Sequence, residues 1–129
     1  MKKEIITTDR APGAIGPYSQ AVALGDLLFC SGQVPIDPQG GPELVGSNIG
    51  EQTEQVLKNV KALLEAGGAS LDSVVKTTVF LTTMDHFQGM NEVYGRVFHA
   101  NKPARSTVAV AGLPRGSLVE IEVIAHRTA

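Results

Sequence analysis

Hydrophobic and polar residues alternate in several short stretches of this chain, as they do in β-strands that bury one face. The alternation, with its β-branched residues, predicts a strand over residues 4–8 and another over residues 74–81. Residues 21–34 are typical of two strands joined by the turn Gly25-Asp26. The first third of the chain is therefore expected to form a strand followed by a β-hairpin.

Two longer stretches repeat their apolar residues at helical spacing instead. The first follows Asn48, which has Glu51 three residues later as in a capping box, and ends at Gly67-Gly68. The second follows Asp85, a candidate N-cap with Gln88 three residues later. Both helices are amphipathic, so we expect each to pack on a sheet through one stripe.

The last quarter of the chain predicts a second hairpin. Its strands cover residues 107–111 and 118–125, and the turn between them contains Gly112, Pro114 and Gly116. The element order is then β-β-β-α-β-α-β-β. This order predicts an α+β fold, a mixed sheet of about six strands with both helices on one face.

Two charged residues, Arg105 and Glu120, lie in this last segment where a sheet usually carries apolar or small side chains. A register that pairs like faces places both on the same side of the hairpin, with their backbones roughly 13 Å apart. That distance is too long for a close ion pair but suits two side chains that hold a small ligand. The pattern by itself favours a simpler interpretation, a surface or interface arginine and a solvated carboxylate.

Composition limits the classes of function. The 129 residues, 43% hydrophobic and 19% charged with a net charge of −2, fit one domain over residues 1–129 and argue against a nucleic-acid partner. No apolar run has membrane-spanning length, and no signal peptide precedes Glu4. Cys30 is the single cysteine, which excludes an internal disulfide and suits a reducing compartment. We therefore expect a cytoplasmic protein.

Individual candidates for chemistry are few. Gly32 within a β pattern indicates a bulge or a closely approached backbone, and Cys30 is better explained as a buried thiol than as a nucleophile. Tyr18 alone is best explained as a core aromatic residue. The sequence has no phosphate loop, CxxC pair or HExxH motif, and its three histidines lack the spacing of metal ligands. A Ser-His-Asp site stays open, because its members need not be adjacent.

Several segments together resemble the RidA family, also called YjgF-like reactive intermediate deaminases. They are APGAIGPYSQAV, CSGQVPID, VVKTTVFL, and PARSTVAVAGL followed by VEIEVIA, and the resemblance extends in order from near residue 11 to residue 127. It implies a chorismate-mutase-like α+β subunit that forms a homotrimer, with active sites in clefts between subunits.

The resemblance also implies an activity, that of a 2-iminobutanoate/2-iminopropanoate deaminase. Such enzymes hydrolyse the enamine/imine intermediates 2-aminoacrylate and 2-aminocrotonate to 2-keto acids and ammonia. Pyridoxal-phosphate enzymes release these intermediates, so the cofactor belongs to them, and none is expected here. Because an imine carbon is already electrophilic, water held by a carboxylate suffices as the nucleophile, and no metal is expected.

By position, Arg105 is similar to the family residue that holds the substrate carboxylate, and Glu120 to the one that positions the attacking water. A planar guanidinium can donate two parallel hydrogen bonds to a carboxylate, which suits Arg105 to this role. Thr107 stands where some family members have cysteine. The other residues that match the substrate pocket are Tyr18, Ser31, Gly32, Asn91 and, more weakly, Phe87.

Two other classes of function stay open. One is a non-catalytic regulator that senses small carboxylates, although it would not need the water-holding Glu120. The other is the ribonuclease or translation-inhibitor activity reported for some family members, against which the acidic balance speaks.

For assembly, we expect a neighbouring subunit to cover the sheet face opposite the helices. The predicted hairpin lets Arg105 and Glu120 of one chain serve one substrate, so mixing chains that lack one or the other should restore little activity.

Overall fold

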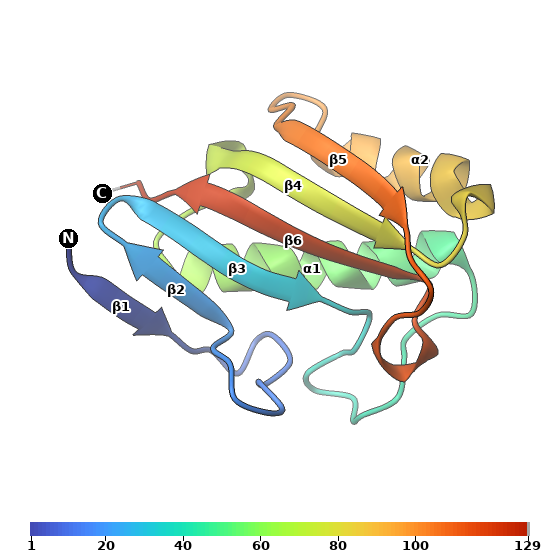
Figure 1. Cartoon of the computed structure of the whole chain (residues 1–129), viewed down its shortest axis with the longest axis horizontal. Coiled ribbons are helices and arrows are strands. Elements are labelled where there is room, and N and C mark those ends of the chain that lie inside the picture. Colours follow the sequence, from blue (N-terminus) through green and yellow to red (C-terminus); the bar gives the residue numbers. More distant parts are fainter. Residues whose placement is uncertain (129) are drawn as a thin grey trace.

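A computed structural model describes residues 1–128, and these form one six-stranded sheet with two α-helices (Figure 1). The strands are β1 (Lys3–Ile6), β2 (Ala21–Leu24), β3 (Leu27–Gln33), β4 (Val74–Leu81), β5 (Ala104–Ala109) and β6 (Val119–His126). The helices are α1 (Ile49–Ala66) and α2 (Phe87–Val97), with short 3-10 turns at Leu71–Ser73, Met84–His86 and Pro114–Gly116. The predicted α+β fold and element order are confirmed.

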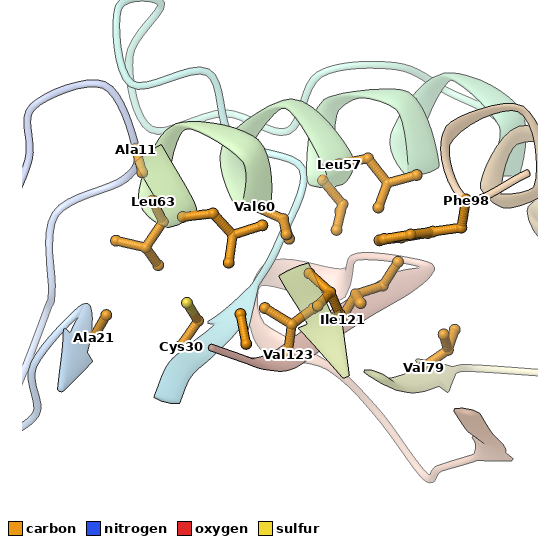
Figure 2. Packing of buried hydrophobic residues seen from close by; sticks show 14 of the residues in the cluster. Ala11, Ala21, Cys30, Leu57, Val60, Leu63, Val79, Phe98, Ile121 and Val123 are labelled. Atoms are coloured by element: carbon orange, nitrogen blue, oxygen red, sulfur yellow. The ribbon is translucent and has the colours of Figure 1, made fainter. Parts of the chain in front are cut away.

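Both helices lie behind the same face of the sheet in Figure 1, and the hydrophobic core fills the space between them. Figure 2 shows Leu57, Val60 and Leu63 of α1 pointing toward Ile121 and Val123 of β6. These side chains are at most 3% exposed. The alternation along β6 and the helical spacing along α1 therefore meet in one core, as the sequence predicts.

The helix starts agree with the sequence in one case and differ in the other. The Asn48 side chain accepts a hydrogen bond from the Glu51 backbone N–H at 2.9 Å, so the predicted N-cap of α1 is confirmed. Asp85 does not cap α2. It lies inside a 3-10 turn capped by Thr83, and α2 begins only at Phe87.

The predicted C-terminal hairpin is wrong. The sheet order is β1-β2-β3-β6-β4-β5, so β4 lies between β5 and β6 (Figure 1). β4 pairs with β5 in parallel and with β6 antiparallel, and every other pair is antiparallel. The turn of Gly112, Pro114 and Gly116 is real, but it belongs to a crossover connection, where Pro114–Gly116 form a 3-10 turn. Local alternation favoured a hairpin, whereas the chain places both strands against β4.

The crossover puts Arg105 and Glu120 on opposite faces. Arg105 is aligned with Thr77, whose side chain is buried under the helices, and Glu120 is aligned with Phe80 on the face away from them. Their backbones lie two strands apart, about 10 Å, and three residues apart along β4, about 10 Å more. The expectation that one chain brings both residues to one substrate is therefore wrong.

The face of the sheet away from the helices, here called the open face, is uncovered. It carries the outward-pointing residues of each strand, and several are large and apolar although at least 36% exposed. These are Ile5, Leu24, Leu27, Phe29 and Val108. Large apolar side chains exposed on one face of a sheet are typical of a protein interface.

Candidate functional site

The sequence-predicted site residues fall into two groups in this chain. Arg105, Asn91, Phe87 and Thr107 lie on the helix side of the sheet, around β5 and α2. Tyr18, Ser31, Gly32 and Glu120 line a cleft at the ends of β3 and β6. We call the first group the arginine half-site and the second the glutamate half-site.

The arginine half-site is built where the edge strand β5 passes α2. Arg105 Nη1 donates a hydrogen bond to Asn91 Oδ1 at 2.6 Å. Its guanidinium carbon lies 5.6 Å from the centre of the Phe87 ring and 4.8 Å from the centre of the Tyr94 ring, distances at which a cation and an aromatic face attract each other. In the sequence, Tyr94 belongs to the apolar stripe that Phe87, Met90, Val97 and Phe98 also form, and this spacing does not indicate a contact with Arg105.

Two polar groups of the arginine half-site are not fully paired within the described residues. Among residues 1–128, no carboxylate lies within ion-pair distance of Arg105. Thr107, two residues along the same face of β5, has a buried Oγ1 without a hydrogen-bond partner in the described part of the chain. A charged fork and an unpaired hydroxyl on one face can together receive a small acid.

The glutamate half-site is an open cleft of about 1390 Å³. Its walls come from three connections, residues 7–18, residues 34–42 and residues 114–115, which gather at one side of the sheet in Figure 1. Tyr18 is 54% exposed, so it is a wall of this cleft and not the core aromatic residue that its local pattern favoured. Its hydroxyl accepts a hydrogen bond from the Ile15 backbone N–H at 3.3 Å, which fixes the ring over the loop.

A β-bulge brings the Glu120 carboxylate over the backbone of β3. The pairing of β3 with β6 shifts register between Cys30 and Gln33, and a Cβ at Gly32 would overlap the Glu120 carboxylate. The predicted close approach at Gly32 is confirmed. Ser31 supports the bulge, because its Oγ donates to the Ser19 carbonyl at 2.6 Å. Ser31 is therefore a scaffold of this half-site as well as part of its wall.

The environment of Glu120 disfavours its charged form. Partial burial raises the pKa of the Glu120 carboxyl above its ordinary value, and the like charge of Glu122, two residues along the same face, raises it further. A carboxylate with a raised pKa is a stronger base than an ordinary glutamate. The glutamate half-site can therefore accept a proton from a bound water.

Cys30 does not take part in such chemistry. Its thiol is buried on the helix side of β3, and burial raises the pKa of Cys30 to about 12. The thiolate form is therefore negligible at neutral pH, and the sequence-based interpretation of Cys30 as a structural thiol is confirmed.

Residues 1–128 contain no group of three metal-ligating side chains. No helix in the described structure is long and apolar enough to cross a membrane.

Comparisons with known proteins match almost the whole chain. The family model described as Endoribonuclease L-PSP matches residues 8–127. The human 2-iminobutanoate/2-iminopropanoate deaminase is 46% identical over 123 residues, which cover 95% of this chain and 89% of the human protein.

Solved structures agree in fold over the same length. A crystal structure from Thermotoga maritima is 60% identical, covers 100% of both chains and has a TM-score of 0.94. The Escherichia coli protein TdcF, crystallised with bound serine, is 47% identical and covers 97% of this chain and 99% of its own, with a TM-score of 0.91.

Proposed function

This chain belongs to the RidA family, which includes YjgF-like proteins and is described by the Endoribonuclease L-PSP model, and from that premise we propose that it is an imine/enamine deaminase. It would hydrolyse 2-iminobutanoate and 2-iminopropanoate, the tautomers of 2-aminocrotonate and 2-aminoacrylate, to 2-keto acids and ammonia. One observation carries the proposal: within residues 1–128 there is a guanidinium without an ion-pair partner and a carboxylate with a raised pKa, and these are the two groups that the reaction uses.

The complete active site combines half-sites from two copies of the chain. Within one copy, Arg105 and Glu120 lie on opposite faces of the sheet with β4 between them, so a substrate of a few atoms cannot contact both. Because β5 is an edge strand, the Arg105 side chain lies at the margin of the molecule. There a neighbouring copy can bring its glutamate half-site against the arginine half-site. The site then forms only on assembly.

The substrate carboxylate binds to the arginine half-site. In the described part of the chain, Nη1 is the one Arg105 nitrogen that donates a side-chain hydrogen bond, to Asn91, so other N–H groups of the guanidinium can donate to both oxygens of a carboxylate. The buried Thr107 hydroxyl, which has no partner in the described chain, gains one in the same event. Bidentate binding fixes the plane of the acid and so the position of its imine carbon.

The water is activated in the glutamate half-site of the neighbouring copy. Glu120 accepts a proton from the water as the water oxygen bonds to the imine carbon, and the electron pair of the C=N bond moves to nitrogen. Glu120 returns that proton to the nitrogen, which gives a carbinolamine. The hydroxyl proton of the carbinolamine then passes through Glu120 to the same nitrogen, the C–N bond breaks with its electron pair on nitrogen, and ammonia leaves as the C=O bond of the 2-keto acid forms. Tyr18 and Gly32 shape the space around that carbon.

The open face is the surface on which the copies meet, and we take the trimer from the family resemblance. Its exposed apolar residues, among them Phe29 and Leu27 at the centre of the sheet, need a cover that this chain does not supply. Sedimentation of the purified protein is expected to show a homotrimer. Substitution of Phe29→Asp should shift it toward monomer and remove activity together with assembly, whereas Lys61→Asp, on the exposed side of α1 away from the sheet, should leave both unchanged.

The direct test is an imine assay. Threonine or serine dehydratase generates the imine, and its decay and keto-acid formation are followed with and without this protein, with Glu120→Gln as the matched control. Decay that is faster with the wild type alone supports the deaminase. If the wild type binds 2-oxobutanoate but leaves the decay at the buffer rate, the protein is a carboxylate-sensing regulator; RNA cleavage by the same preparation would instead favour a ribonuclease. The cytoplasmic location stays a prediction.

A further inference from the structure

Arg105 is held along one face of α2. Its three contacts there are Phe87, Asn91 and Tyr94, which recur at positions i, i+4 and i+7 and so share a face of the helix. Asn91 fixes one nitrogen of the guanidinium, and the Tyr94 ring, with its centre 4.8 Å from the guanidinium carbon, lies closer than the Phe87 ring at 5.6 Å. The Tyr94 ring is therefore the main support under the cation.

Tyr94 is itself fixed from two sides. Its ring packs against Phe98 with a centroid distance of 4.7 Å, and its hydroxyl shares a 2.7 Å hydrogen bond with Thr77 Oγ1. Burial of the ring raises the pKa of Tyr94, so the hydroxyl stays protonated at neutral pH. A tyrosine bonded in this way has little freedom to rotate away from Arg105.

Thr77 is a polar residue at a position of β4 where packing alone would favour an aliphatic side chain. It is fully buried on the helix side, where its neighbours Val79 and Leu81 are aliphatic, and valine would fill the same volume. A buried hydroxyl is costly unless it is hydrogen-bonded, and the partner of Thr77 is the Tyr94 hydroxyl. Thr77 is also aligned with Arg105 across the β4–β5 pair. The polar pair therefore lies directly behind the arginine.

We propose that Tyr94, locked by Thr77, is a positioning residue that holds the Arg105 guanidinium in the orientation that receives the substrate carboxylate. An arginine on an edge strand would otherwise sample many rotamers, and fixing it before the substrate arrives removes that ordering cost from binding. Tyr94 covers one face of the guanidinium and leaves its edge for the acid. This inference rests on the proposed function.

The test measures binding of 2-oxobutanoate, the expected product, together with turnover. Tyr94→Leu removes the supporting ring and should raise the dissociation constant and KM roughly 3- to 30-fold, with a smaller effect on kcat. Tyr94→Phe keeps the ring but loses the hydrogen bond to Thr77, so it should lose affinity measurably but less than Tyr94→Leu. Thr77→Val removes the same hydrogen bond and should lose the same amount, and unchanged affinity in both would show that the hydrogen bond does not position Arg105. Leu28→Ala is the matched control, because it truncates a fully buried side chain on β3, three strands away from Arg105 on β5.

A spectroscopic readout separates this inference from the proposed function. The Arg105 Nε–H resonance should carry a ring-current shift that Tyr94→Leu removes and Leu28→Ala leaves in place. In an Arg105→Lys background, Tyr94→Leu should cost less affinity than in the wild type, since the two residues act as a unit. Equal losses in Tyr94→Leu and Leu28→Ala, or an unchanged Arg105 resonance in Tyr94→Leu, would overturn the positioning role. If Tyr94→Leu does not fold, Thr77→Val and Tyr94→Phe decide by the same measurements. If the wild-type protein does not hydrolyse the imine, the deaminase proposal is wrong, but the resonance test of Tyr94 still applies.

Discussion

The two faces of the sheet differ although the same strands build both. Along β6, Val119, Ile121, Val123 and Ala125 point toward the helices and are at most 2% exposed. The residues between them point to the open face and include two carboxylates. One face is completed within the chain, and the other is not.

This difference extends to the polar groups on each face. On the helix side, Thr77 and Tyr94 satisfy each other, and Arg105 has an amide and two rings around it. On the open face, Glu120 is half-buried beside a second carboxylate that raises its pKa. The helix side of the sheet therefore fixes the position of the Arg105 guanidinium. The open face instead holds the Glu120 carboxylate where its charged form is disfavoured. Sites that sacrifice stability for reactivity commonly show this pattern.

The largest effect that tests the comparison is expected from Glu120→Gln. The amide keeps the size of the side chain but cannot accept a proton, so kcat should fall about 10²- to 10⁴-fold, the usual contribution of a general base. Binding of 2-oxobutanoate should change little, because Arg105 holds the acid. Steady-state kinetics and calorimetric titration measure the two effects. Weakened binding with intact turnover would contradict the assignment.

The same variant should be more stable than the wild type at neutral pH. The folded-state pKa of Glu120 lies above its unfolded value, so the folded protein binds the proton more tightly. The Glu120 contribution to stability therefore falls as pH rises from the unfolded pKa through the folded one. Thermal unfolding at pH 4 and pH 7 should show the gain of Glu120→Gln only at pH 7.

The second prediction concerns the two faces in the assembly. If Arg105 and Glu120 of one site come from different copies, refolding Arg105→Ala and Glu120→Ala chains together in equal amounts should restore about a quarter of the wild-type activity in a symmetric ring with one such site per interface. Each variant refolded alone should stay inactive. This expectation replaces the one drawn from the predicted hairpin. No recovery in mixed assemblies of wild-type size would return both residues to one chain.

The third prediction tests the geometry of the completed face. Arg105→Lys keeps the charge but loses the planar guanidinium that donates two parallel hydrogen bonds. Transition-state stabilisation should therefore fall by about 1.5 to 3 kcal/mol, which lowers kcat/KM roughly 10- to 150-fold. Most of this fall should come from a higher KM, with a smaller change in kcat. Arg96→Lys, an exposed arginine whose ion-pair partner is Glu54, is the control and should leave kinetics unchanged. Near-normal KM in Arg105→Lys would exclude the carboxylate clamp.

The smallest effect is a shift in pH dependence caused by Glu122→Gln. Hydrolysis needs ionised Glu120, so kcat/KM should fall as pH drops through the raised pKa of Glu120. Removing the neighbouring charge lowers that pKa, and the acid limb of the profile should move to lower pH. Asp72→Asn, an exposed charge far from the cleft, should not move it. An unmoved limb in Glu122→Gln would mean that burial alone sets the pKa.

Local patterns in the sequence determined the elements and the fold class. Alternation along residues 74–81 and 118–125 gave strands, and helical spacing after Asn48 gave α1, because both periodicities follow from backbone geometry within one element. The resemblance to RidA proteins assigned roles to all eight candidate site residues, because it can be recognised from short sequence motifs without knowledge of the fold. Tyr94 was visible only as a member of an apolar stripe, and Thr77 only as part of a strand.

Only the tertiary structure decided which strands are neighbours. Alternation fixes which residues of one strand share a face, but it does not say which partner that strand takes or which face the helices cover. The insertion of β4 between β5 and β6 depends on the packing of α2 and of the crossover through Pro114–Gly116, contacts between residues far apart in sequence. That insertion turns Arg105 toward the helices and Glu120 toward the open face, and so divides the candidate site into two half-sites.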